Sequence, residues 1–248
     1  MIDRPPLSII LCTTPRSGST LVCALLRASG RGGAPESWYR AVDRDEYAAD
    51  WGIQRTDGTY DPAAYRTAAI RAGQGPDGTF GLRLQADTLA PLLTELAGLY
   101  PGERTDRTLI EAAFGPCQFV YVRRHDSVAQ AVSRLKAEQT QIWHHDGTEP
   151  ERAAAPLSYD ARRIDAFRQE AASGNAAWED WFRRHNLTPH RLVYEEFAAR
   201  PADSVRALLA ALGRPLPAGA PLTVPNRRMS DETSADWAAR YRTDRATA

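Results

Sequence analysis

Several features that define large protein classes are scarce or absent in this chain. Its 31 basic residues include a single lysine, Lys136, and they balance 31 acidic residues, so the formal net charge is zero. A nucleic-acid-binding protein usually carries a basic surplus, so this balance argues against a nucleic-acid partner. No apolar run approaches the roughly 20 residues that a membrane helix needs, so no membrane partner is expected. Residues 1–6 also lack the apolar core of a signal peptide.

Cysteine is equally scarce. The chain has three, Cys12, Cys23 and Cys117, an odd number in apolar surroundings without the spacing of metal ligands. Such residues are typical of reduced core positions rather than of disulfides or metal sites. We therefore expect a cytoplasmic protein with no bound metal.

Short apolar runs alternate with helical patterns along the 248 residues. This alternation is typical of an α/β fold in which helices cover both faces of a parallel sheet. We predict strands near residues 7–11, 79–84, 118–122 and 191–194. A helix that begins at Asp126 or Ser127 is expected to run through Ile142, and a long Trp-rich core helix to end near residue 185. The chain is predicted to form a single domain, with an insert at residues 31–78 and a C-terminal extension or lid at residues 214–248.

The loop after the first strand has the composition of an anion-binding site. From residue 13 it reads Thr-Thr-Pro-Arg-Ser-Gly-Ser-Thr, and an apolar helical run follows. A helix start offers unpaired backbone N–H groups and the positive end of the helix dipole. Arg16 adds a charged fork, and hydroxyl groups add further donors. We predict that a phosphate or sulfate group binds here, at Pro15, Arg16, Ser17, Gly18, Ser19 and Thr20; an ordinary turn between strand and helix is the structural alternative.

This loop differs from the loop that binds ATP or GTP. The nucleotide loop reads G-x-x-x-x-G-K-[ST], whereas this chain lacks the first Gly and has Ser19 in place of the Lys. The strand at residues 118–122 leads into Arg123 and Arg124 rather than into a carboxylate that could hold Mg²⁺. A basic residue followed by S-G-S-T is similar instead to the 5′-phosphosulfate loop of sulfotransferases, commonly written P-[KR]-[ST]-G-[ST]-T.

A second anion site is predicted at the next charged turn. Arg124 follows the strand at residues 118–122, and Ser133 lies roughly 10 Å along the helix that comes after it. An arginine before the helix and a serine further along it can bind an anion from two sides. The structural alternative is a surface arginine and a serine that bonds to its own helix.

Further motifs occur along the chain, between and after these two sites. They are Gly-Ala-Pro-Glu at 33–36, Gly-Leu-Arg-Leu at 81–84, Gln-Ala-Val-Ser at 130–133, Glu-Gln-Thr-Gln-Ile-Trp at 138–143, Tyr-Glu-Glu at 194–196, Arg228, and Asp-Trp at 236–237. With the loop and Arg124, they resemble the trehalose 2-sulfotransferase family of bacterial sulfotransferases over nearly the whole chain. The resemblance implies a P-loop-like three-layer α/β fold that binds 3′-phosphoadenosine-5′-phosphosulfate (PAPS).

The resemblance also implies roles for individual residues. Residues 15–20 would hold the 5′-phosphosulfate end of PAPS, Arg124 and Ser133 its 3′-phosphate, and Arg228 would close over the nucleotide. The insert at residues 31–78 would lie on the acceptor side. A homodimer is expected by analogy with the family.

The chemistry of sulfuryl transfer suggests which residues act on the reacting groups. Negative charge grows on the leaving phosphate, and fixed donors such as Arg16 can stabilise it without an obligatory metal. The acceptor hydroxyl also needs a base, for which Glu36 is the candidate. Family members often carry an acidic residue where this chain has Ser37, so His144 and His145 remain alternatives.

The sequence thus predicts a PAPS-dependent sulfotransferase acting on a hydroxyl of a small metabolite, such as a sugar or a glycosylated natural product. One alternative is a P-loop phosphotransferase that uses ATP, and another is a nucleotide-binding protein without catalysis. Tyr47, Trp51, Tyr60 and Tyr65 in the insert either line the acceptor site or pack the insert onto the domain.

Overall fold

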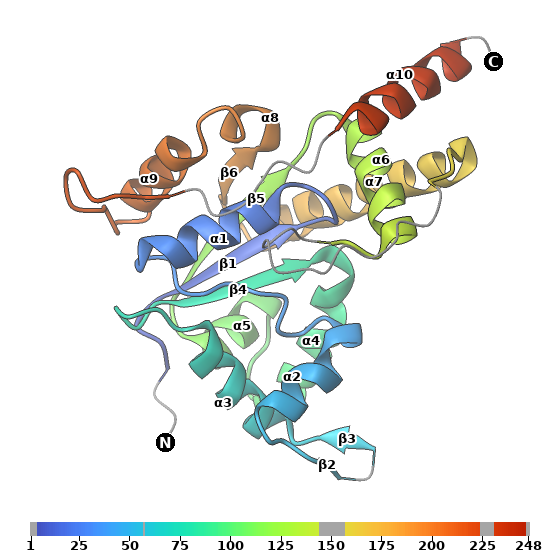
Figure 1. The fold of residues 1–248 in the computed structure, drawn as a ribbon. Helices are drawn as coiled ribbons and strands as arrows, with labels where there is room; N and C mark the ends of the chain where they lie inside the picture. Colours follow the sequence, from blue (N-terminus) through green and yellow to red (C-terminus); the bar gives the residue numbers. More distant parts are fainter. Residues whose placement is uncertain (1–3, 57, 144–156, 224–230, 247–248) are drawn as a thin grey trace.

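The computed structural model describes residues 4–56, 58–143, 157–223 and 231–246, and within them the chain forms a parallel sheet flanked by helices (Figure 1). The strands of this sheet are β1 (Ser8–Thr13), β4 (Phe80–Gln85), β5 (Cys117–Arg123) and β6 (His190–Val193). The helices around it are α1 (Ser19–Ser29), α4 (Ala86–Leu99), α5 (Asp106–Phe114), α6 (Ser127–Thr140), α7 (Ala161–Arg184), α8 (Tyr194–Phe197), α9 (Pro201–Ala211) and α10 (Glu232–Ala246). The predicted fold class is confirmed.

The strand order brings the charged loops together. Among the described residues the sheet runs β4-β1-β5-β6, and every neighbouring pair is parallel. All six residues of β1 are buried, which agrees with its place between β4 and β5. Because parallel strands end at the same edge of a sheet, the segments that follow β1 and β5 lie side by side there.

Side chains that alternate along β1 build the two layers of the core. Ile9 and Leu11 pack with residues of α1 and α9 on one face. Ile10 and Cys12 point to the other face, where α4, α5 and the C-terminal half of α7 lie (Figure 1). Trp178 and Trp181 of α7 are each 1% exposed, so the prediction that this Trp-rich stripe is core is confirmed.

The start of α6 agrees with its prediction, but its end does not. Asp126 caps the helix, because its carboxylate accepts from the backbone N–H of Ala129 at 2.9 Å. The helix ends at Thr140, and Gln141 adopts a left-handed conformation with φ 58°. The prediction that the helix runs through Ile142 is wrong, since this left-handed residue ends it.

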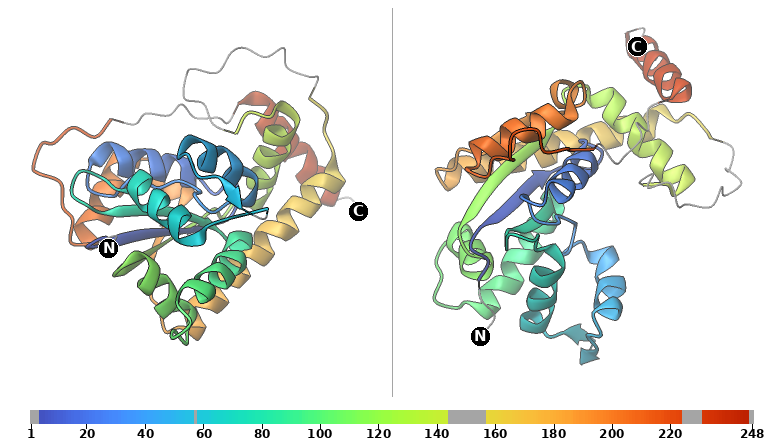
Figure 2. Two further views of the ribbon diagram at one scale, coloured as in Figure 1. Left: turned by 90° about the horizontal axis from the view of Figure 1, so that it is seen from below. Right: turned by 60° about the vertical axis from the view of Figure 1, so that its left-hand side comes forward.

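The C-terminal helix α10 packs against α6 and α7 (Figure 2). Its buried residues Ala238 and Tyr241 join the apolar cluster between those helices. The ammonium of Lys136 on α6 donates to Asp231, which precedes α10, at 2.5 Å. The C-terminal helix is therefore held against α6 by both apolar packing and an ion pair.

The insert contains η1 (Ala41–Asp43), α2 (Arg44–Asp50), the short hairpin β2 (Arg55–Thr56) and β3 (Thr59–Tyr60), and α3 (Pro62–Gly73). Tyr65 is fully buried, and Tyr47 stacks on Trp51 with 5.4 Å between ring centroids. These rings and Tyr60 pack on the main core cluster, so packing of the insert accounts for them.

The structure also bears on the expectations for the cysteines and for membrane-spanning helices. Cys12 and Cys23 are buried, Cys117 is half-buried, and all three are free thiols. Among the described residues, no helix combines the length and the apolar character needed to span a membrane.

Candidate functional site

The predicted anion loop lies between β1 and α1, at the carboxyl edge of the sheet. Gly18 precedes the helix in a left-handed conformation with φ 92°, and as a glycine it has no side chain to cap the helix start. A Cβ atom on Gly18 would lie 2.3 Å from Cδ2 of Tyr194, so only glycine lets this ring lie against the loop. The first N–H groups of α1 therefore face a site closed on one side by an aromatic ring.

Ser17 gives a direct indication that the loop fits an anion. Its side chain is fully buried, and its hydroxyl has no hydrogen-bond partner among the described residues. A buried hydroxyl without a partner is unfavourable and needs an explanation such as a ligand. A phosphate or sulfate oxygen could accept a hydrogen bond from this hydroxyl.

Arg16 reaches across the site to α6. Its Nε donates to Oγ of Ser133 at 3.0 Å, and its Nη1 donates to the carbonyl oxygen of Trp143 at 2.6 Å. Burial, together with the nearby charges of Arg124 and Arg83, lowers the pKa of Arg16 to about 10. Three guanidinium groups therefore converge on this edge of the sheet.

Arg124 lies just beyond the end of β5, over a cavity of about 320 Å³. The residues lining this cavity are Arg124, Asp126, Tyr194, Glu195, Ala198 and Ala199. The Arg124 guanidinium lies 4.5 Å from the centre of the Tyr194 ring, and its Nε lies 3.8 Å from a carboxylate oxygen of Glu195. Because Ser133 bonds to Arg16, the two predicted anion sites form one continuous cationic region.

Two residues that sequence reasoning missed hold this region in shape. Gln130 of α6 is 2% exposed, and its amide donates to Oγ1 of Thr14 at 3.0 Å and to the carbonyl oxygen of Pro15 at 2.7 Å. Arg83 of β4 donates from Nη1 to Oγ1 of Thr20 at 3.1 Å. In the sequence, both residues are long polar side chains within apolar runs. Burial of such a side chain requires polar partners, and this was the signal that could have pointed to them.

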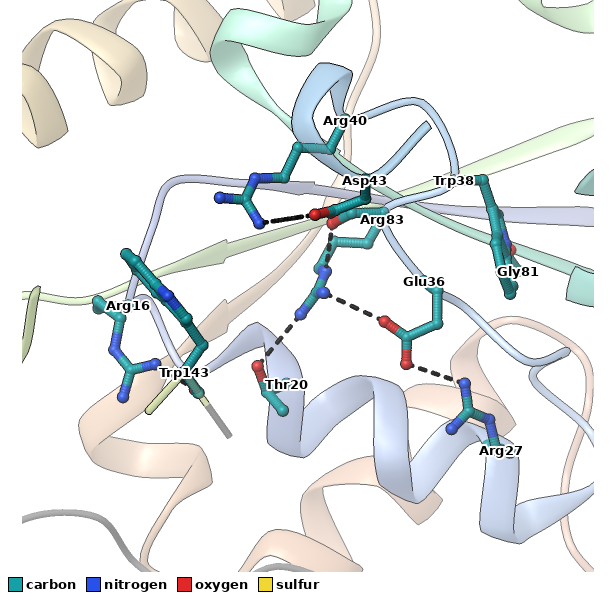
Figure 3. A network of polar contacts seen from close by, with 11 residues as sticks. Arg16, Thr20, Arg27, Glu36, Trp38, Arg40, Asp43, Gly81, Arg83 and Trp143 are labelled. Atoms are coloured by element: carbon teal, nitrogen blue, oxygen red, sulfur yellow. Dashed lines mark hydrogen bonds and ion pairs between the residues drawn. The ribbon is translucent and has the colours of Figure 1, made fainter. Parts of the chain in front are cut away.

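Glu36 lies beside the first turns of α1 (Figure 3). One of its carboxylate oxygens lies 2.9 Å from Nη2 of Arg27, and the other lies 3.1 Å from Nη2 of Arg83. Its backbone carbonyl accepts from the N–H of Arg83 at 3.0 Å, so the segment runs along the edge of β4. The backbone before Glu36 lies very close to β4, because a Cβ atom on Gly33 would lie 2.4 Å from the backbone nitrogen of Gly81.

Of the remaining predicted site residues, two lie in the anion loop and the others fall outside the described residues. Ser19 is buried at the first position of α1, and Pro15 is held through its carbonyl oxygen as above. His144 and His145, the alternative bases, and Arg228, the residue expected to close over the nucleotide, lie outside the described residues. The roles assigned to all these residues stay predictions.

Fold and site together define an α/β protein with a candidate anion-binding loop between its first strand and first helix. Comparison with known proteins then gives the family. The sequence profile of the Stf0 sulphotransferase family matches residues 8–244, and the chain belongs to this family. The predicted resemblance is confirmed.

Two trehalose 2-sulfotransferases agree with the family assignment. The trehalose 2-sulfotransferase of Mycobacterium tuberculosis is 30% identical over an alignment of 259 positions. The alignment covers 95% of this chain and 94% of that protein. The trehalose 2-sulfotransferase of Mycolicibacterium smegmatis is 29% identical over 266 residues, covering 98% and 97%. A solved sulfotransferase domain from the Synechococcus PCC 7002 olefin synthase aligns with a TM-score of 0.46 at 14% identity, covering 98% of this chain and 89% of that one.

Proposed function

We propose that the protein transfers a sulfuryl group from PAPS to a hydroxyl of a small metabolite, such as a sugar or a glycosylated natural product. The observation that carries the proposal is the convergence of Arg16, Arg83 and Arg124 on a helix start where the buried hydroxyl of Ser17 has no partner among the described residues. PAPS carries anionic groups at both ends, which suits a continuous cationic region better than a single pocket.

The proposed donor site follows from this arrangement. The loop from Pro15 to Thr20 holds the 5′-phosphosulfate, with Ser17 Oγ donating to one of its oxygens. Arg124 and Ser133 hold the 3′-phosphate. Arg16, which contacts Ser133, bridges the two ends. Membership in a sulfotransferase family supports PAPS as the donor.

In the reaction, the bond between sulfur and the bridging phosphate oxygen breaks while a new bond forms to the acceptor oxygen. The electron pair leaves with the phosphate of adenosine 3′,5′-bisphosphate, where Arg16 and the helix start stabilise the charge. Glu36 takes the proton of the acceptor hydroxyl. Each Glu36 oxygen already accepts from one arginine, and a carboxylate oxygen retains capacity for a further hydrogen bond.

One contact argues against ATP as the donor. In ATP- and GTP-binding loops the Ser or Thr hydroxyl at the start of the helix binds Mg²⁺. Here the hydroxyl of Thr20 accepts from the guanidinium of Arg83 at 3.1 Å. A fixed cation of the protein therefore lies beside the group that would otherwise hold the metal, so sulfuryl transfer is the better fit.

The test is a transfer assay with radiolabelled PAPS and a panel of hydroxylated metabolites. We expect a labelled product that still forms in EDTA, together with release of adenosine 3′,5′-bisphosphate. Adenosine 5′-phosphosulfate is the matched donor control, because it lacks only the 3′-phosphate assigned to Arg124 and Ser133, and it should react poorly. Turnover with ATP that stops in EDTA would replace the proposal by a phosphotransferase; tight nucleotide binding without any transfer would replace it by a non-catalytic binding protein.

A further inference from the structure

Arg83 makes more side-chain contacts than an anion ligand needs. It is 8% exposed, and each of its three guanidinium nitrogens donates to a different side chain. Nε donates to Ser37 Oγ at 2.8 Å, Nη1 to Thr20 Oγ1 at 3.1 Å, and Nη2 to Glu36 Oε2 at 3.1 Å (Figure 3). The whole fork is therefore committed to contacts within the protein.

These partners belong to opposite sides of the candidate site. Thr20 lies in the first turn of α1, next to the loop that holds the donor. Glu36 and Ser37 belong to the segment that follows the close approach of Gly33 to Gly81. Arg83 itself is anchored in β4, directly opposite Leu11 of β1. One rigid side chain thus sets the separation between the donor loop and the candidate base.

We propose that Arg83 is a positioning residue that aligns the base Glu36 with the donor loop. The proposal rests on the proposed function, in which Glu36 takes the acceptor proton. A planar guanidinium holds all three partners in fixed directions, so the carboxylate has little freedom to turn away from the acceptor. By donating to Thr20, Arg83 also polarises that hydroxyl, which strengthens the hydrogen bond that the hydroxyl itself donates.

A purely electrostatic role is the competing explanation. The charge of Arg83 acts on Arg16, so Arg83 could assist simply by adding positive potential to the anion site. The two explanations predict different effects when a lysine replaces Arg83. Lysine keeps the charge, but its single nitrogen on a flexible chain cannot reach all three partners in the geometry of the fork.

The experiment compares Arg83→Lys and Arg83→Met with the wild type. The control is Arg66→Met, which removes another half-buried arginine whose contact is the carbonyl oxygen of Ala113, in α5 and away from the site. Initial rates give kcat and the acceptor KM, and calorimetry gives Kd for adenosine 3′,5′-bisphosphate.

For Arg83→Lys we expect kcat to fall by about 10- to 100-fold, with nucleotide Kd and acceptor KM unchanged. Arg83→Met should lose kcat, should also bind nucleotide more weakly, and should regain part of its kcat when guanidinium ion is added. Arg66→Met should behave as the wild type. An Arg83→Lys variant with the kcat of the wild type would overturn the positioning role and leave the electrostatic one.

Amide exchange supplies a readout that needs no turnover. The backbone N–H at position 83 donates to the carbonyl oxygen of Glu36, so exchange in a peptide covering β4 reports whether the Glu36 segment stays seated. We expect amide exchange in this peptide to be faster than in the wild type in both Arg83 variants. In Arg66→Met it should proceed at the wild-type rate. Wild-type exchange in Arg83→Lys contradicts the inference, even if catalysis is lost. A wild-type protein that sulfates no acceptor contradicts the proposed function, while exchange still decides whether Arg83 holds the segment.

Discussion

Arg16 is held in a conformation that an arginine adopts only under constraint. Its φ of 62° is left-handed, which is uncommon for a residue other than glycine. Burial and the charges of Arg124 and Arg83 lower its pKa to about 10, so its charged form is disfavoured in the folded protein. Strain of this kind persists where the surrounding structure enforces it, typically at a functional site. A bound anion would add a negative charge beside Arg16 and favour its charged form.

The substitution Arg16→Ala is expected to reduce kcat, because it removes a fixed donor from the leaving phosphate. The expected loss is ~2–4 kcal/mol of transition-state stabilisation, measured as the change in kcat for transfer from PAPS. Arg66→Ala serves as the control for loss of a half-buried arginine. A variant that keeps the wild-type kcat would remove Arg16 from the catalytic role.

Arg124→Ala is expected to weaken nucleotide binding rather than slow the chemical step. Its guanidinium lies over the Tyr194 ring at the cavity beyond β5, where the 3′-phosphate is proposed to bind. Calorimetry with adenosine 3′,5′-bisphosphate should show a higher Kd by about 10-fold or more, since a hydrogen bond to a charged group contributes ~1.5–3 kcal/mol. Adenosine 5′-monophosphate, which lacks the 3′-phosphate, should bind the variant and the wild type equally. Equal losses for both nucleotides would show that Arg124 does not read the 3′-phosphate.

Glu36→Gln tests the base directly, because the amide keeps the shape of the side chain but cannot take a proton. We expect kcat to fall by about 100-fold or more, within the range for a general base, while Kd for adenosine 3′,5′-bisphosphate stays that of the wild type. Normal turnover would redirect the search to His144 and His145.

At the scale of elements, the start of α6 connects the candidate site to the C-terminal helix. Asp126 caps α6 and also accepts from Nη2 of Arg242 on α10 at 2.8 Å and 2.9 Å through its two oxygens. Burial by itself would raise the pKa of Asp126, but the Ala129 N–H and the charge of Arg242 outweigh burial and leave the pKa below its usual value. Since the folded state favours the carboxylate, the contribution to stability is present above the unfolded pKa of about 3.8 and is lost as pH falls through the lower folded value.

Asp126→Asn should therefore lower Tm in a pH-dependent way. The amide oxygen can still cap the helix, but the charge that attracts Arg242 is gone. We expect a decrease of about 2–4 °C at neutral pH, because a half-exposed ion pair contributes up to ~1 kcal/mol. The difference from the wild type should vanish well below pH 4. Glu103→Gln, which removes an exposed carboxylate between α4 and α5, controls for the change in net charge. A difference that persists in acid would disprove the ion-pair explanation.

The elements were predictable from sequence where apolar periodicity determines them. The strands at the centre of the sheet are short apolar runs, and Asp126 and Pro201 mark helix starts through their own chemistry. The hairpin of β2 and β3 was missed, since its two-residue strands are exposed and carry no apolar alternation. The end of α6 depends on one left-handed residue, Gln141, which no periodicity reveals.

The candidate site was predictable in its loop and not in its cross-connections. The hydroxyl side chains of the loop and Arg16 predict an anion site through their type and spacing. The bond between Arg16 and Ser133 spans 117 positions, and the contact of Arg83 with Thr20 spans 63. Such contacts depend on strand order and register, so sequence reasoning assigned Ser133 to Arg124 and gave Arg83 no role. Long-range polar contacts are the part of a site that only the folded chain defines.

At the scale of the whole molecule, a chain without net charge brings Arg83 and Arg124 close enough to Arg16 to act on its charge. The unfolded pKa of Arg16 lies above its folded pKa of about 10, so at neutral pH the unfavourable effect of its charge is fully present in the folded protein. It would fade only as pH rises above that value. An anionic ligand that binds only the folded protein would relieve the same effect at neutral pH. Ligand binding and folding stability would then be coupled through these arginines.

Adenosine 3′,5′-bisphosphate should accordingly raise Tm. At 100 times its Kd, mass action stabilises the folded state by about 2.7 kcal/mol, which corresponds to roughly 5–10 °C for a chain of this size. Differential scanning fluorimetry measures the shift, with adenosine as the uncharged control. Because the stabilisation is electrostatic, it should shrink in high salt, and in Arg124→Ala it should be smaller at the same ligand concentration. A shift of equal size with adenosine would mean that the base, and not the charged groups, dominates binding, and the cationic region would then lose its proposed purpose.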